Sequence, residues 1–275
     1  MSKTIYSISR PALIRIARPS VVCLTLVMGL APASAYRPFD GTDAAVADKD
    51  RVEIELQPAG ILKDWSGKTL IAPAARFNYG LTETWEAVLE GQFENPLSPS
   101  GPASLTAAGA FLKGVLREGS LQKKDGLSVA TEFGVLLPDS RGPSQFGASL
   151  AGIVSQRWDW GAIHLNGVAE LTREHRADLF TGVIIEGPSK WTVRPVAEVF
   201  YEKEFGKSET VSGLVGVIWQ VQEDLSFDVG VRHALTNGHP VNEVRAGMTL
   251  GFSLAPLHSP RREAGRTHRR QGRGL

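Results

Sequence analysis

The sequence contains very little cysteine, with Cys23 as the one residue of this type in 275. It also lacks any apolar run near the roughly 20 residues that a membrane-spanning helix requires. Because Cys23 lies in an N-terminal segment that we expect to be removed, the mature chain is predicted to hold no disulfide and no thiolate-bound metal. The remaining composition, with 42% hydrophobic and 21% charged residues, excludes a disordered chain or a collagen.

Acidic residues are absent from the first 35 positions, which carry four basic ones. A short apolar run over residues 21–30 follows, and Ala33 and Ala35 then form an A-x-A site. This order is typical of a secretory signal peptide, so we expect export from a Gram-negative cytoplasm and cleavage after Ala35. The predicted organisation is a signal peptide over 1–35, a periplasmic segment over 36–51, a β-barrel over 52–254, and a basic, disordered tail over 255–275.

Charge is unevenly distributed along the chain. Residues 258–275 hold six arginines and one glutamate. Between Tyr36 and Leu257 there remain 20 basic and 28 acidic residues, a net charge of about −8. An exported chain with an acidic body is not expected to bind nucleic acid.

The 3.6-residue period of helices is also lacking after Arg51, where polar and apolar residues alternate instead. In the last such segment one face carries Val244, Ala246, Met248, Leu250 and Phe252, and the other carries Glu243, Arg245, Gly247, Thr249 and Gly251. We predict twelve strands, at 52–60, 68–80, 84–94, 103–117, 126–138, 144–157, 159–172, 176–186, 191–205, 209–221, 225–235 and 242–254.

Such alternation fits either a soluble sandwich or a membrane barrel whose apolar side faces lipid. Strand length favours the barrel, since soluble strands average about five or six residues and a tilted transmembrane strand needs about nine to eleven. The even strand number is typical of bacterial barrels. The sequence therefore predicts an all-β fold, a 12-stranded antiparallel transmembrane β-barrel of the outer-membrane type.

Tryptophan positions agree with this interpretation. If both ends of the barrel sequence lie in the periplasm, the even-numbered turns also face the periplasm, and five tryptophans lie beside those turns. Indole rings prefer the headgroup level of a bilayer. The predicted aromatic girdle consists of Trp85, Trp158, Trp160, Trp191, Trp219 and Phe252.

Two stretches resemble a known family. They are RPFDGTDAAVA at residues 37–47 and APAARFNYGLTETWE at residues 72–86. Both are similar to outer-membrane transporters grouped under the phenol-degradation MetA-pathway label. The resemblance implies an outer-membrane barrel that takes up small solutes, including aromatic or other hydrophobic compounds, and it carries over no site residues.

Strand parity places many charged side chains on the inner face, with acids in excess. The functional interpretation is a cation-preferring or solute-selective channel, and the alternative is an interior closed by its own ion pairs. The expected constriction residues are Arg76, Glu86, Glu90, Arg194, Glu198, Glu202, Asp228, Arg232, Glu243 and Arg245. The other expected inner-face residues are Glu53, Glu55, Glu94, Glu132, Arg157, His164, Asn166, Glu170 and Asp178.

The predicted outside loops are too short to fold into the barrel. Residues 36–50, which precede the first strand, are a better plug candidate. Their short, acidic composition favours a disordered periplasmic tail, and a plug inside the barrel is the alternative.

Signals for chemistry are scarce. The six histidines show no metal-ligand spacing, and no phosphate-binding glycine loop is present, so we expect no enzyme, metal or cofactor. The runner-up hypotheses are a closed structural or adhesive barrel and, third, a lipid hydrolase based on His233, which lacks a suitable serine on neighbouring strands. The expected partners are outer-membrane lipid and lipopolysaccharide, an unidentified small-molecule solute, and the barrel-insertion machinery.

Overall fold

The computed structural model describes residues 37–254. The predicted signal peptide, with its Ala33 and Ala35 cleavage site, and the predicted C-terminal tail lie outside the described residues.

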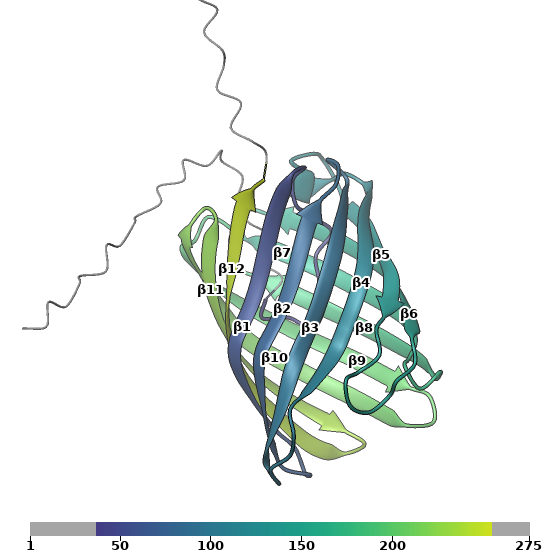
Figure 1. Ribbon diagram of the computed structural model, residues 1–275. Coiled ribbons are helices and arrows are strands. Elements are labelled where there is room, and N and C mark those ends of the chain that lie inside the picture. Colours follow the sequence, from purple (N-terminus) through teal and green to yellow (C-terminus); the bar gives the residue numbers. More distant parts are fainter. Residues whose placement is uncertain (1–36, 255–275) are drawn as a thin grey trace, which may run out of the picture.

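Twelve antiparallel strands form a closed barrel, in which each strand pairs with its sequence neighbours (Figure 1). The first and last strands close the ring through a ladder that runs from Arg51 opposite Ser253 to Lys63 opposite Asn242. This confirms the predicted fold class. The strands are β1 (Arg51–Lys63), β2 (Lys68–Gly80), β3 (Trp85–Ser98), β4 (Ser104–Arg117), β5 (Ser128–Leu136), β6 (Gly147–Trp158), β7 (Gly161–Leu171), β8 (Ala177–Glu186), β9 (Val193–Glu204), β10 (Ser208–Gln222), β11 (Leu225–Thr236) and β12 (His239–Ser253).

The two faces of each strand differ in chemistry because successive side chains point to opposite sides of a sheet. In β12, Glu243 and Arg245 are buried inside the barrel while Val244 and Leu250 are exposed outside. The barrel therefore has an apolar outer surface and a polar lumen, the reverse of a soluble β-sandwich.

Several strands are longer or shorter than predicted by a few residues. β1 continues to Lys63 because a bulge between Leu56 and Ala59 accommodates Pro58 and lets the strand resume its pairing. A second shift, between Ile71 and Ala74, accommodates Pro73 in the same way. Proline has no N–H to donate to a ladder, so bulges are where a strand tolerates it.

One short helix interrupts the β pattern. The turn between β4 and β5 contains the 3₁₀ helix η1 (Ser120–Gln122), where the sequence predicted no helical element. Its Leu121 packs against the buried cluster of Ala130, Ala151 and Ile153 on the inner wall. Within residues 37–254 no helix is long and apolar enough to cross a membrane.

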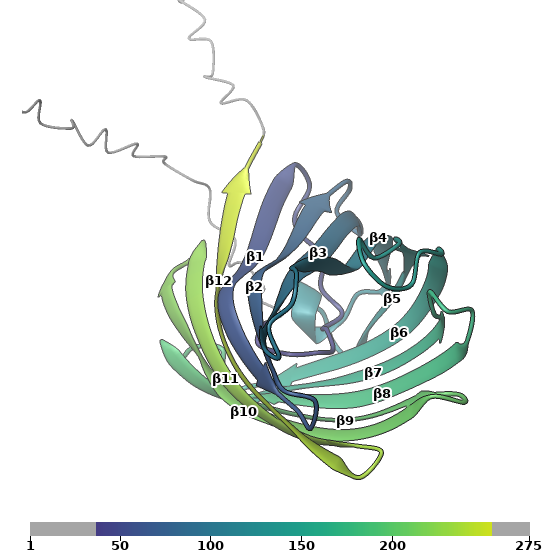
Figure 2. The ribbon, with the colours of Figure 1, turned by 60° about the horizontal axis from the view of Figure 1, so that its bottom comes forward.

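Residues 37–50 lie inside the barrel (Figure 2). From the start of β1 the segment passes Gly80 of β2, where Lys49 forms a bridge, and then crosses the lumen. The expectation of a disordered periplasmic tail is therefore wrong, and the segment has the position of the alternative, a plug. The physical reason is that its backbone N–H groups find charged and polar acceptors on the lumen wall, which composition alone does not reveal.

Candidate functional site

Residues 37–41 of the plug segment are held by charged side chains of β9, β11 and β12. The carboxylate of Glu198 accepts hydrogen bonds from the backbone N–H groups of Asp40 (2.8 Å) and Gly41 (2.7 Å). Gly41 suits this close approach, since a Cβ there would lie 3.1 Å from Glu198 Oε1 and the carboxylate would have to shift slightly. One lumen carboxylate thus fixes two consecutive peptide groups.

Arg245 and Asp228 hold the beginning of the segment. The Arg245 guanidinium donates to the carbonyl oxygen of Pro38 (3.0 Å) and to the carboxylate of Asp40 (3.3 Å). Arg37 lies 3.6 Å from Asp228 and donates to Gln57 at 2.5 Å. Burial lowers the pKa of the Arg37 guanidinium, and the carboxylate of Asp228 opposes this shift.

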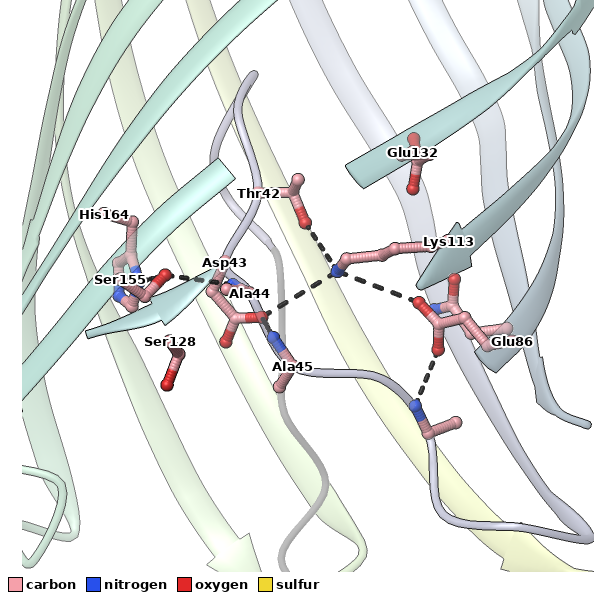
Figure 3. Close-up of polar contacts among 12 residues, drawn as sticks. Thr42, Asp43, Ala44, Ala45, Glu86, Lys113, Ser128, Glu132, Ser155 and His164 are labelled. Carbon is pink, nitrogen blue, oxygen red and sulfur yellow. Dashed lines mark hydrogen bonds and ion pairs between the residues drawn. The ribbon is translucent and has the colours of Figure 1, made fainter. Parts of the chain in front are cut away.

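Lys113 of β4 anchors the middle of the segment, and its side chain is fully buried (Figure 3). Its Nζ lies 3.3 Å from the Thr42 hydroxyl, 3.9 Å from Asp43 and 3.7 Å from Glu86. Glu86 in turn accepts the backbone N–H of Ala47 at 2.6 Å. A buried lysine between two carboxylates therefore ties the plug segment to β3 and β4.

Ala44 is the most deeply packed residue of the segment, with no exposed surface. Its N–H donates to the Ser155 hydroxyl at 2.9 Å, and that hydroxyl also contacts His164 Nδ1 at 2.8 Å (Figure 3). Gln122 of η1 donates to the Ala44 carbonyl oxygen at 2.9 Å. The backbone N–H and carbonyl groups of Ala44 are therefore both hydrogen-bonded, and its side chain packs in an apolar pocket formed by β5, β6 and η1.

The plug segment separates two cavities in the lumen. The distal chamber, on the side of the β7–β8 turn, has a volume of about 520 Å³ and is lined by Arg37–Thr42 together with Arg76, Glu90 and Glu202. The proximal chamber, on the side where β1 begins, has a volume of about 640 Å³ and is lined by Asp43, Asp48, Glu186 and Arg194. The segment contributes different residues to each chamber, as a partition would.

The predicted constriction residues all lie on the inner face, but they do not form one ring. Arg76, Glu90, Glu202, Arg232 and Arg245 line the distal chamber, and Arg194 lines the proximal one. Glu86, Glu198 and Asp228 bind the plug segment.

Several of these residues form ion pairs on the inner wall. Arg76 pairs with Glu90 (2.7 Å) and Glu132, and Arg232 pairs with Glu243 (2.9 Å). Arg194 pairs with Glu186 (3.2 Å) rather than with Glu198, because Glu198 is engaged by the segment.

The remaining inner-face predictions also point into the barrel. The buried members are Glu53, Glu55, His164, Asn166 and Asp178, and the members that line the chambers or contact them are Glu94, Glu132, Arg157 and Glu170. Sequence reasoning missed Lys113 and Glu186, although the same strand parity could have placed both inside. It also missed Arg37, Asp40 and Asp43, which lie outside any strand and give no periodic signal.

The predicted aromatic girdle lies at one end of the barrel, the end at which β1 begins. Trp85 opens β3, Trp158 closes β6 and stacks on Trp160 with ring centroids 5.2 Å apart, Trp191 precedes β9, and Trp219 and Phe252 lie near the ends of β10 and β12. Trp65, in the β1–β2 turn, lies at the opposite end beside His239.

His233 lies on the exposed outer face and contacts Asn242 Oδ1 at 2.8 Å. The residue opposite it on β10 is Gly213, which offers no nucleophile. Among residues 37–254, no group of three histidine, cysteine, aspartate or glutamate side chains is arranged to hold a metal ion.

Comparison with solved structures places this fold among the outer-membrane β-barrels, in agreement with the predicted class. The COG4313 outer membrane channel from Pseudomonas putida F1 superimposes with a TM-score of 0.57 at 8% identity, over 76% of this chain and 97% of the other. A KdgM porin in complex with disordered oligogalacturonate superimposes with a TM-score of 0.51 at 9% identity, over 74% of this chain and 99% of the other. A second KdgM porin structure has a TM-score of 0.50 at 12% identity, over 73% of this chain and 99% of the other.

Sequence comparisons add nothing to this. No protein-family model matches the chain, and a search of curated proteins finds no match. At such low identity the structural likeness concerns the fold.

Proposed function

We propose that this protein is a passive channel in the bacterial outer membrane that admits small solutes. Its apolar outer surface suits contact with lipid, and its polar lumen suits water and solutes. The superimposable structures include proteins described as a channel and as porins, which supports the same function. Solutes would cross by diffusion, without chemical turnover, and the protein would not be an enzyme.

The observation that carries this proposal is the pair of chambers on either side of the plug segment. Each has a volume in the range of small-molecule sites, about 300–1,000 Å³. A barrel with only a structural role has no need of such volume. Passage between the chambers would require residues 37–44 to move aside from the lumen wall.

A more specific part of the proposal is that the channel admits aromatic or other hydrophobic solutes. It follows from the resemblance of residues 37–47 and 72–86 to the MetA-pathway transporters. It is supported by Phe111, Phe180 and Phe200, whose rings line the distal chamber among the charged residues.

Conductance of the mature chain in planar bilayers tests the channel function. After refolding in detergent is confirmed by heat-modifiable gel mobility, we expect discrete current steps. Swelling of liposomes in benzyl alcohol, compared with swelling in a sugar of oligosaccharide size, would show the size limit. Folded protein that produces neither current steps nor swelling would contradict the proposal.

A closed structural or adhesive barrel is the second candidate, and the plug segment favours it. The segment is hydrogen-bonded to β3, β6, β7, β9 and β12, so it could close the lumen permanently. Locking it with a disulfide between Ala44→Cys and Ser155→Cys distinguishes the two candidates. A channel would lose its current steps on oxidation and regain them on reduction, whereas a closed barrel would show none in either state.

The partners follow from the same proposal. The girdle of Trp85, Trp158, Trp160, Trp191 and Trp219 would contact lipid headgroups at the periplasmic side, and lipopolysaccharide would surround the opposite end. The barrel-insertion machinery would place the chain in the membrane. A lipid hydrolase is disfavoured by Gly213 opposite His233.

A further inference from the structure

Acidic side chains gather on one part of the distal chamber wall, formed by β7, β8 and β9. Glu170 lies directly opposite Asp178 across the β7–β8 ladder, and Asp178 lies opposite Glu204 across the β8–β9 ladder. Glu202 points to the same side from β9. Like charges directly opposite one another destabilise a sheet, so strand pairing gives no reason for this arrangement.

Asp178 is 6% exposed and lines the distal chamber. Like Glu202, it has no hydrogen-bond or ion-pair partner within residues 37–254. By contrast, Glu170 accepts a hydrogen bond from Ser149, and Glu204 lies 3.3 Å from Lys207 Nζ. The Asp178 side chain opens onto the chamber, so the hydrogen-bond partner of its carboxylate must come from the contents of the chamber, either water or a bound solute.

The bases nearby are already engaged. Glu202 has Asp178, Asp40 and Glu170 as acidic neighbours, and the base that opposes them is Arg232. The Arg232 guanidinium pairs with Glu243 at 2.9 Å, and Arg245 contacts that same carboxylate at 2.9 Å. The acidic wall therefore faces the chamber with Asp178 and Glu202 unpaired, while Arg173 lies near Glu170 and Lys207 near Glu204.

Aromatic rings lie beside these carboxylates. Phe180 is directly opposite Glu202 across the β8–β9 ladder. Its ring lies 5.0 Å from that of Phe200, centroid to centroid, and both rings line the chamber. Phenylalanine faces attract cations and stack on other rings. Carboxylates next to such rings suit a cation that carries an apolar body.

We propose that Asp178, Glu202 and Phe180 bind a small organic ammonium ion with an aromatic substituent in the distal chamber. The ammonium group would supply the missing partner of Asp178, and the aromatic substituent would lie against Phe180 and Phe200. This inference rests on the proposed channel function, since the channel gives the cation access to the chamber and makes it a transported solute class.

Isothermal titration calorimetry of the refolded mature chain in detergent tests this site. The probes are benzylammonium, benzyl alcohol and benzoate, which share a phenyl ring with one attached carbon and differ in charge. A hydrogen bond to a charged group contributes enough to change affinity about tenfold. We therefore expect benzylammonium to bind about tenfold more tightly than benzyl alcohol, with benzoate weakest. Equal affinities for benzylammonium and benzyl alcohol would overturn the proposal.

Two variants and one control locate the binding. Asp178→Asn and Glu202→Gln should each weaken benzylammonium binding about tenfold while leaving benzyl alcohol unchanged. Glu209→Gln, which removes an exposed acid on the outer side of β10, should change neither. Heat-modifiable mobility identifies any variant that does not fold. If one lumen variant does not fold, the other shows whether the cation binds at this wall. Unchanged benzylammonium binding in a folded lumen variant would show that the cation does not bind at this wall.

Liposome swelling with the same preparation separates this proposal from the channel function. Benzylammonium binding without solute flux would refute the channel and leave the site intact. Solute flux without selective benzylammonium binding would refute the site and leave the channel intact.

Discussion

The two walls that hold the plug segment do so by different means. The wall formed by β9, β11 and β12 binds residues 37–41 through Glu198, Asp228 and Arg245, beside the water-accessible distal chamber. The wall formed by β3–β6 binds residues 42–47 through Lys113 and a pocket in which Ala44 has no exposed surface. The charges on both walls are buried, with Glu198 2% and Arg245 7% exposed, but residues 39–42 line the distal chamber whereas Ala44 is sealed from water.

This difference indicates where the segment would open first. Removing a partner from a buried ion pair costs about 3–5 kcal/mol, whereas water in the adjoining distal chamber can replace the hydrogen bonds of residues 37–41 when these residues leave the wall. The β9–β12 wall should therefore release residues 37–41 while residues 42–47 stay in place. Partial release would enlarge the distal chamber without detaching the whole plug.

The comparison can be measured with two labelling reporters. The mature chain is predicted to contain no cysteine, so Phe39→Cys reports on the first half of the segment and Ala45→Cys on the second. Both positions are half-buried and line a chamber, so release of one half of the segment is measured as the rise in the rate at which a water-soluble maleimide reacts there, relative to the reporter without a second change. A tenfold change in that rate corresponds to about 1.4 kcal/mol.

Lys113→Met should have the largest effect. It leaves the buried carboxylate of Glu86 without its cation, which costs about 3–5 kcal/mol. We expect labelling of the Ala45→Cys reporter to rise at least a hundredfold, and the open probability in bilayers to rise with it. Lys124→Met is the matched control, because Lys124 is exposed and pairs only at the surface with Glu118. An unchanged Ala45→Cys rate in folded Lys113→Met would show that Lys113 is not the anchor.

Lys113 also shows which parts of the molecule the sequence can reveal. The twelve strands and the two faces follow from alternation, which is a local property, and the strand bounds are off by only a few residues. Lys113 has the inner parity of β4, so its direction was predictable. Its partners, Glu86 and Asp43, come from another strand and from the plug segment, and no local pattern reports such a pairing.

The sequence left the position of the plug segment open, with a plug inside the barrel as the alternative to the favoured periplasmic tail. Residues 37–50 have no period, and their backbone N–H groups bind acceptors as far away in sequence as Asn166 and Glu198. The contact requires a glycine at position 80, since a Cβ there would lie 1.9 Å from the carbonyl oxygen of Asp48. In the sequence, however, that glycine is indistinguishable from an ordinary turn residue after a strand.

Glu198→Gln should have an intermediate effect, restricted to one reporter. The amide keeps the shape of the carboxylate but has one acceptor oxygen, so only one of the N–H groups of Asp40 and Gly41 keeps its bond and the other faces an NH2 donor, a loss of about 1–3 kcal/mol. Labelling of Phe39→Cys should rise about tenfold while that of Ala45→Cys stays within about twofold. An equal rise at both reporters would mean that the segment is released as one unit, which contradicts the proposed division.

Ser155→Ala should have the smallest effect, and it tests whether packing or hydrogen bonding dominates the β3–β6 wall. The change removes the acceptor of the Ala44 N–H and the partner of His164 Nδ1, which costs about 0.5–1.5 kcal/mol for a neutral bond. The Ala44 carbonyl oxygen keeps its hydrogen bond to Gln122, and the Ala44 methyl group stays packed beside Ala130 and Ile153. Labelling of the Ala45→Cys reporter should therefore rise only about threefold to tenfold, with that of Phe39→Cys unchanged.

Thr131→Val is the control, because the Thr131 hydroxyl donates to the Ala151 carbonyl oxygen of the neighbouring strand and makes no contact with the segment. If Ser155→Ala released the segment as fully as Lys113→Met, the hydroxyl would be the anchor, and the buried ion pair would serve only to neutralise Glu86.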